Sequence, residues 1–451
     1  MVLAPWTCVC GQRNAGPSPC PRCLTPAPVW VQQEPVLPAP PPRSRWHAPL
    51  AIVIAVLLVA AAFAAGAVDG DDRGAGGGLT AAEGAGQTIS VTPEGADTAG
   101  LSGVALEIAE ALPAMMRFVE EKRGLQFKEP VEVTLLGDKA FRARLQGLQE
   151  EETEDDRAQI ETNARVLKAL GLLEGDVDLA EATESLLGDA VAGFYDTEND
   201  DLVVRGEELS GSVKVTFVHE LTHALQDQYF ELDREDIEER DDEASQAFTS
   251  LIEGDAVRIE ELYRATLPER EQKAIEREEM NAAGGIDPSV PRILLELLSF
   301  PYAVGPQFAT AVVAEGGQER LDAAFREPPT TSEQILNPDR YLADGAPPRI
   351  LENPKADGKI IDQGVIGQLG MILILQRILD DDDAFVASDG WGGDRYVAWR
   401  SGDKTCVRTN LVMDTATDAR EMADALRRAA RQRKSIDASI TPALLTFTSC
   451  N

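Results

Sequence analysis

The sequence predicts an α+β protein built from three parts: a small cysteine-rich module, one membrane-spanning helix and a large C-terminal body. Three observations indicate this organisation. Four cysteines lie within the first 23 residues, residues 48–68 carry no charge, and helix-like and strand-like patterns alternate from residue 101 onward. The 451 residues have a net charge of −35. Nucleic acid is therefore not expected as a partner, because phosphate binding needs an excess of Lys and Arg.

The first module, residues 1–24, contains two closely spaced pairs of cysteines, Cys8, Cys10, Cys20 and Cys23. Four thiolates at such spacing can bind one Zn²⁺ tetrahedrally. The segment resembles a zinc finger of the Ran-binding-protein type, in which Trp6 and Asn14 occupy characteristic positions beside the first pair. The resemblance implies a structural Zn²⁺ and a possible cytosolic protein partner. The alternative is a zinc knuckle that only stabilises its own fold.

Residues 48–68 are predicted to be a transmembrane helix, because 21 uncharged residues would span roughly 30 Å as a helix. Arg43 and Arg45 precede this segment and acidic residues follow it, which predicts a cytoplasmic N-terminus. A Pro-rich linker at 25–47 and a flexible Gly-rich stalk at 69–100 flank the helix. We therefore expect a single-pass protein of the cell membrane.

The body after the stalk is predicted to be extracytoplasmic, with a main domain at 101–350 and a C-terminal part at 351–451. It contains only two cysteines, Cys406 and Cys450. Since the predicted compartment is oxidising, the two are expected to form a disulfide that fixes the C-terminus.

Two of the three histidines fall in one pentapeptide, His219-Glu220-Leu221-Thr222-His223. Apolar residues recur at helical spacing across 212–230, and histidines four apart on a helix face the same side. Both imidazoles can then bind one metal, with Glu220 beside the water on that metal. This is the motif of zinc hydrolases.

Such a site needs a third protein ligand, and no histidine follows His223. A carboxylate remains, and a second helix is predicted over 242–263. Glu253 lies beside a narrow face of small residues on this helix, whereas Asp255 projects into its apolar stripe. Periodicity alone does not choose between these two carboxylates.

The two helices together resemble the gluzincin metallopeptidases, which carry His-Glu-x-x-His and, on a second helix, Glu-Gly-x-Ala. The matching residues are Glu253, Gly254 and Ala256, with Glu260 seven positions after Glu253. The similarity extends over about 190–425 to a group of bacterial secreted or membrane-anchored gluzincins. Asn337 departs from that group, in which a histidine often stands there.

The resemblance implies a zincin-like fold: a small mixed sheet with an active-site helix and a second ligand helix. It implies that His219, His223 and Glu253 bind the catalytic Zn²⁺. Glu220 would be the general base in hydrolysis of a peptide or protein substrate. A hairpin at 190–205 would offer an edge strand to the extended substrate, or would be an ordinary hairpin.

Three further side chains are candidates with plain alternatives. Tyr302 and Tyr341 could donate a hydrogen bond to the oxyanion, or could be core tyrosines. Asp227 could orient a ligand, or could be a solvated carboxylate. The alternative function is a non-catalytic zinc-binding receptor or scaffold that recruits partners through its finger.

Overall fold

The protein is described here from a computed structural model. The structure describes residues 5–7, 13–15, 54–57, 86–150, 154–205, 208–238, 240–284, 286–343, 347–433, 435–440 and 444–451.

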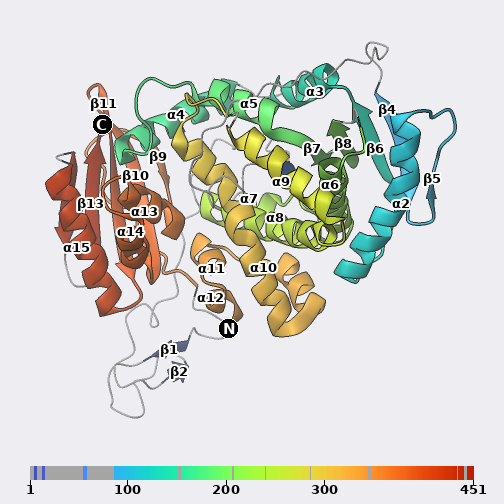
Figure 1. The fold of residues 1–451 in the computed structure, drawn as a ribbon. Coiled ribbons are helices and arrows are strands. Elements are labelled where there is room, and N and C mark those ends of the chain that lie inside the picture. Colours follow the sequence, from blue (N-terminus) through green and yellow to red (C-terminus); the bar gives the residue numbers. More distant parts are fainter. Residues whose placement is uncertain are drawn as a thin grey trace.

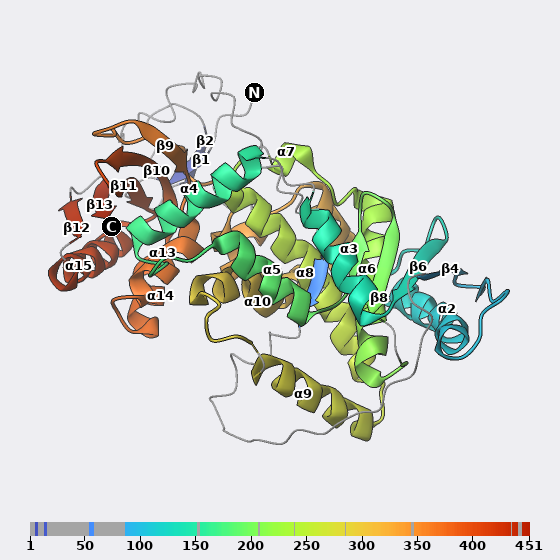
Figure 2. The ribbon, with the colours of Figure 1, turned by 90° about the horizontal axis from the view of Figure 1, so that it is seen from above.

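Two β-sheets lie toward opposite ends of the molecule, with helices between them (Figures 1 and 2). One is a mixed six-stranded sheet of order β3-β7-β8-β6-β4-β5, in which only β6 and β8 pair in parallel. Its strands are β3 (Ile54–Leu57), β4 (Gln87–Thr92), β5 (Gly95–Ala96), β6 (Val131–Leu136), β7 (Val191–Asp196) and β8 (Asp201–Arg205). The predicted α+β class is confirmed.

The other sheet is formed by the C-terminal part of the chain and is antiparallel, with the order β12-β13-β11-β10-β9. Its strands are β9 (Ile360–Gly364), β10 (Trp391–Ser401), β11 (Lys404–Met413), β12 (Ile436–Ile440) and β13 (Leu445–Cys450). Cys406 and Cys450 are opposite each other in β11 and β13 and form a disulfide. The predicted pairing of these two cysteines is confirmed.

The helices of the main body are α2 (Val104–Arg123), α3 (Asp138–Glu150), α4 (Glu154–Leu170), α5 (Leu179–Ala190), α6 (Gly211–Phe230), α7 (Glu235–Glu238), α8 (Asp242–Arg264), α9 (Glu269–Gly284), α10 (Arg292–Arg326), α11 (Ser332–Leu336) and α12 (Pro338–Leu342). The C-terminal part adds α13 (Gly367–Gln376), α14 (Asp381–Ser388) and α15 (Ala416–Gln432). One hydrophobic core continues from α4, α8 and α10 into α13, β10 and β11. The two predicted parts of the body therefore pack as one unit.

At the N-terminus the structure describes two short antiparallel strands, β1 (Pro5–Thr7) and β2 (Arg13–Ala15). Trp6 and Asn14 are opposite each other in this pair. The four cysteines of the predicted finger lie outside the described residues, so the finger stays a prediction.

Of the predicted transmembrane helix at 48–68, the structure describes only residues 54–57. At these residues it differs from the prediction. Ile54–Leu57 form the strand β3, which pairs antiparallel with β7. In this structure these four residues are therefore a strand and not part of a helix, and the membrane span as a whole stays a prediction. A short apolar segment can satisfy its backbone hydrogen-bonding groups either in a helix or by pairing with a sheet edge. Hydropathy alone does not distinguish these two structures.

The predicted flexible stalk at 69–100 is also wrong in its last part. Residues 87–96 form β4 and β5, and Ile89 and Val91 are fully buried beneath α2. Ile89 and Val91 alternate with polar residues, as in a half-buried strand, but this short pattern follows a long segment rich in glycine and alanine that is typical of a flexible linker. Burial against α2 and pairing with β6 supply the contacts that order this segment.

The two helices that carry the predicted ligands are confirmed, with bounds close to those expected. Ser210 caps α6 by accepting a hydrogen bond from the Val213 amide, and Asp241 caps α8 through the Ala244 amide. A side chain at this position satisfies a backbone donor that the helix leaves free.

Helix α10 packs closely against the small-residue face of α8. A Cβ atom on Gly254 would lie 2.2 Å from the carbonyl carbon of Gly305, and one on Gly305 would lie 2.2 Å from the Ser250 carbonyl oxygen. No larger side chain fits at either position unless the helices separate. This contact holds Tyr302 of α10 beside the middle of α8.

Within the described part of the chain, α10 is the one helix long and apolar enough to cross a membrane. It is kinked at Gly316 and Gly317, where the backbone leaves the helical conformation. Phe308 and Val312 of this helix are fully buried in the main core. Core helices of globular proteins share this length and composition.

Buried carboxylates connect α8 to the C-terminal part. Glu243 accepts hydrogen bonds of 2.7 Å from both the backbone and the hydroxyl of Ser332, and that hydroxyl accepts one from the Leu369 amide in α13. Burial, together with the nearby charge of Asp394, raises the pKa of Glu243 to about 8, although the Ser332 hydrogen bonds oppose the shift. The folded protein therefore favours the protonated form of Glu243.

This shift predicts how stability depends on pH. Because the pKa of Glu243 is higher in the folded chain than its ordinary value of 4.5, its contribution is fully present below 4.5 and is lost as pH rises to about 8. Glu243→Gln keeps an acceptor for Ser332 but does not titrate. We expect the wild type to lose stability relative to this variant between about pH 5 and pH 8. Urea unfolding at several pH values measures the difference, and a constant difference would contradict the assignment.

Candidate metal centre

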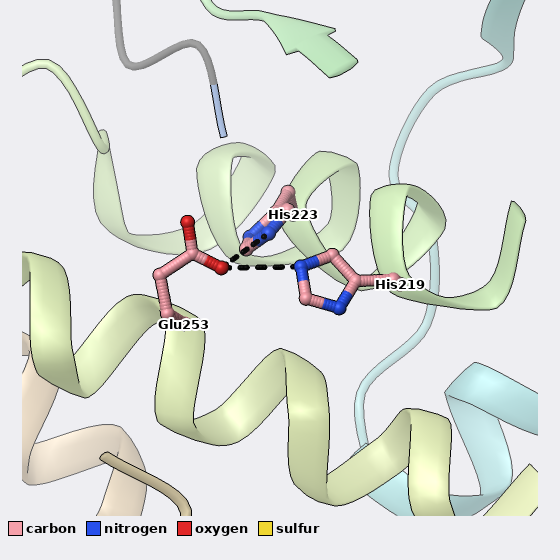
Figure 3. Close-up of side chains that lie close together, drawn as sticks. All are labelled: His219, His223 and Glu253. Atoms are coloured by element: carbon pink, nitrogen blue, oxygen red, sulfur yellow. Dashed lines mark hydrogen bonds and ion pairs between the residues drawn. The ribbon is translucent and has the colours of Figure 1, made fainter. Parts of the chain in front are cut away.

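Three side chains that the sequence proposes as metal ligands converge in the centre of the molecule. Nε2 of His219 lies 3.1 Å and Nε2 of His223 lies 3.4 Å from the same oxygen, Oε2 of Glu253. One ligand atom from each residue lies within 4.8 Å of the others, and all three residues are buried. Figure 3 shows both imidazoles on α6 pointing toward the Glu253 carboxylate on α8.

These distances fit a tetrahedral zinc ion. With metal–ligand bonds of about 2.0–2.1 Å, two ligand atoms on a tetrahedron are about 3.3 Å apart. The two measured separations from Glu253 Oε2, 3.1 and 3.4 Å, bracket that value. His223 Nε2 is buried and makes no hydrogen bond to a described residue. A cation between the three atoms would satisfy this nitrogen.

Glu220 is the second unsatisfied group of the cluster. The residue is fully buried, and neither carboxylate oxygen makes a hydrogen bond of normal geometry to a described residue. Burial, with the nearby Glu253 and Glu260, raises the pKa of Glu220 well above its ordinary value, while His219 and the Tyr195 backbone act in the opposite direction. A buried carboxylate without partners is costly, so this arrangement suits a group that receives a water or a substrate atom.

His219 is oriented by a second carboxylate on α8. Its Nδ1 lies 2.9 Å from Oε2 of Glu260, and since a carboxylate accepts, Nδ1 donates. The opposite nitrogen is then directed to Glu253. Burial lowers the pKa of His219, but the hydrogen bonds to Glu253 and Glu260 outweigh this effect and raise it to about 10. The sequence had indicated Glu260 only by its spacing from Glu253.

His223 is oriented by an amide. Its Nδ1 lies 2.9 Å from Oε1 of Gln226, one turn further along α6. Burial lowers the pKa of His223, although Glu253 opposes the shift. Sequence reasoning missed Gln226. The signal available was its position three residues after His223, on the same face of the helix.

Glu253 is held by one of the two tyrosines proposed as oxyanion donors. The Tyr302 hydroxyl donates to Oε1 of Glu253 at 2.7 Å, which leaves Oε2 facing the histidines. Burial raises the pKa of Glu253, but the neighbouring His223 and His219 outweigh this and lower it to about 2. Tyr302 therefore reaches the cluster, where its hydroxyl proton is directed to Glu253.

The structure does not bring the other tyrosine to the cluster. The Tyr341 hydroxyl donates to the Glu327 carbonyl at 2.7 Å, and its ring packs against Phe308 and the Arg320 guanidinium. These partners lie along the later part of α10 and beyond its end. Tyr341 packs against the hydrophobic core, which was the alternative expected for it.

The two acidic residues left open by the sequence both lie outside the histidine cluster. Asp255 faces Arg123, Arg258 and Gln226. Asp227 accepts hydrogen bonds from the Tyr195 hydroxyl and the Leu232 amide, and it lines a cavity of about 430 Å³ beside β7. It is neither a partner of a metal-site histidine nor a fully solvated carboxylate.

Comparison with known proteins gives one match. Residues 358–442 match a family described as a domain of unknown function, DUF8575. The matched region runs from just before β9 to just after β12 and contains none of His219, His223 and Glu253. No curated protein and no solved structure matches the chain.

Two substitutions in α8 can distinguish the role of Glu253 from that of Asp255. Glu253→Ala removes a ligand, so the full-length protein should contain one zinc ion fewer per chain than the wild type. Asp255→Asn leaves all three ligand atoms in place and should retain wild-type zinc content at saturation. Elemental analysis after dialysis measures both, with circular dichroism to establish folding. Loss of zinc from Asp255→Asn together with retention in Glu253→Ala would contradict the assignment.

Proposed function

We propose that the protein is a membrane-anchored zinc metallopeptidase. The observation that carries this proposal is the buried convergence of His219, His223 and Glu253 beside the unpartnered carboxylate of Glu220. An ion-pair cluster that served stability alone would not leave both oxygens of Glu220 without a hydrogen bond of normal geometry, because a buried carboxylate in that state destabilises the fold. The arrangement is what a hydrolytic site needs.

In the proposed mechanism His219, His223 and Glu253 hold the zinc ion. Zinc, when bound, lowers the pKa of a water molecule to about 7 and polarises the scissile carbonyl. Glu220 accepts a proton from the attacking water and passes it to the leaving amine nitrogen. Glu260 and Tyr302 keep His219 and Glu253 in their orientations through the hydrogen bonds described above.

The edge of β7 is the proposed binding site for the substrate backbone. β7 directly precedes β8 in the predicted hairpin and packs against α6. Its outer edge accepts β3 as an antiparallel partner, with Ile54 opposite Tyr195. A peptide bound in the same way would gain main-chain hydrogen bonds with little dependence on its sequence. Substrate and β3 would compete for this edge.

Glu220→Gln tests the chemistry, because it keeps a similar shape but cannot accept the proton. We expect cleavage of an unstructured protein to fall roughly 10²- to 10⁴-fold with zinc content unchanged. Glu208→Gln is the matched control, since Glu208 is an exposed residue just before α6. Wild-type cleavage should stop with a chelator and return with zinc.

One observation favours the alternative, a non-catalytic zinc-binding receptor or scaffold. Both tyrosines considered as oxyanion donors direct their hydroxyl protons elsewhere, Tyr302 to Glu253 and Tyr341 to Glu327. In that case the wild type would bind zinc at the histidine cluster but cleave nothing. The same assay therefore decides between the two functions.

Membrane anchoring through 48–68 is part of the proposal and rests on its uncharged sequence and its flanking charges. A membrane-spanning helix satisfies its own backbone, so Ile54–Leu57 cannot be in the membrane and paired with β7 at the same time. Insertion would therefore leave the β7 edge open to substrate.

Topology can be tested on intact cells. Because the basic flank precedes the span, externally added protease should release a large C-terminal fragment and leave an epitope at the N-terminus protected. Immunoblotting of both ends reports the result. Protection of the C-terminal body would show the opposite orientation.

A further inference from the structure

A chain of buried polar side chains runs from His223 through Gln226 and Asp255 to Arg123, and the proposed mechanism does not use it. Gln226 is fully buried and donates from Nε2 to Oδ2 of Asp255 at 3.0 Å and to the Ile252 carbonyl at 3.2 Å. Asp255, also fully buried, lies 2.7 Å from Nε of Arg123 and accepts a hydrogen bond of 2.8 Å from Arg258.

Each contact in this chain has a fixed direction. Arg123 and Arg258 can only donate, so the Asp255 carboxylate that they flank is held as an acceptor. The two neighbours of Gln226 Nε2, the Asp255 carboxylate and the Ile252 carbonyl, are both acceptors. The NH₂ group of the Gln226 amide therefore points toward Asp255, and the amide oxygen points toward His223. An imidazole nitrogen that faces an amide oxygen must carry the proton.

We propose that Gln226, held by Asp255 and Arg123, is a positioning residue that fixes the proton of His223 on Nδ1 and so keeps Nε2 free for the metal. The proposal rests on the metal-binding role of His223 given above. It assigns to Asp255 a part in the site that is different from coordination.

The last residue in this series of polar contacts, Arg123, lies far from α6 in the sequence. Arg123, at the end of α2, is fully buried and also donates to Gln318 at 2.8 Å and to Asp322 at 3.0 Å, both in α10. The orientation of His223 thus depends on how α2, α8 and α10 pack together.

Three variants test the proposal in the full-length protein. Gln226→Met removes all three polar contacts of the side chain, to His223, Asp255 and the Ile252 carbonyl, and we expect zinc affinity to fall roughly 10- to 100-fold, the usual effect of losing the partner of a ligating histidine. Gln226→Glu keeps an acceptor for Nδ1 but places two carboxylates together, so it should lower stability while leaving the His223 proton in place. Gln228→Met is the matched control, because Gln228 bonds only to the segment before β6 among its described contacts.

The decisive readout is the tautomer of His223, observed by nitrogen NMR of metal-free protein labelled at its three histidines. Wild type, Gln228→Met and Gln226→Glu should carry the proton on Nδ1, and Gln226→Met should lose this preference. A purely structural role would make the protonation of Nδ1 independent of the substituent at 226 and would refute the proposal, as would a wild-type His223 that carries its proton on Nε2 alone, since Nε2 also faces Oε2 of Glu253. Failure of the wild type to bind zinc would instead overturn the proposed function and leave the tautomer result valid.

Discussion

The architecture depends on burying two imidazoles and four carboxylates in one contact between α6 and α8. His219 and His223 are fully buried, and the residues Glu220, Glu253, Asp255 and Glu260 are at most 7% exposed. Each buried charge costs several kcal/mol unless it is paired. Four of the six groups are satisfied by one another or by Gln226, Tyr302, Arg123 and Arg258, whereas Glu220 and one nitrogen of His223 are not. The unsatisfied atoms define the place where chemistry is possible.

Helix α8 can bury several carboxylates because its different faces contact different neighbours. Glu253 and Glu260 face α6, Asp255 faces the guanidinium groups of Arg123 and Arg258, and Gly254 lets α10 approach closely. The first turn of the same helix supplies Glu243 to the junction with α11 and α13. The histidine cluster and the C-terminal part of the chain are thereby joined through one helix. The match to a domain of unknown function covers only the C-terminal side of this junction.

The outer edge of β7 in the six-stranded sheet adds a second constraint. An unpaired edge strand exposes backbone donors and acceptors, and β3 covers those of β7. The same edge lies beside the helix that carries both histidines. A segment that binds there is placed next to the proposed site through main-chain contacts, whatever its side chains are. If the proposed substrate binds at this edge, its binding is linked to the position of Ile54–Leu57, which cover the edge in this structure.

Local sequence alone determined the two ligand helices, the pair His219 and His223, the hairpin of β7 and β8, and the Cys406–Cys450 pair. Helical periodicity, capping residues and the small number of cysteines are local or countable properties. Periodicity could not choose between Glu253 and Asp255, and it did not identify Gln226 or the ordered strand β4. The tertiary structure decided these because each depends on a partner distant in the chain: Tyr302 of α10 for Glu253, Arg123 for Asp255, Asp255 for Gln226, and α2 and β6 for β4. A buried polar group is fixed by the donors and acceptors that surround it, and these are set only when the helices pack.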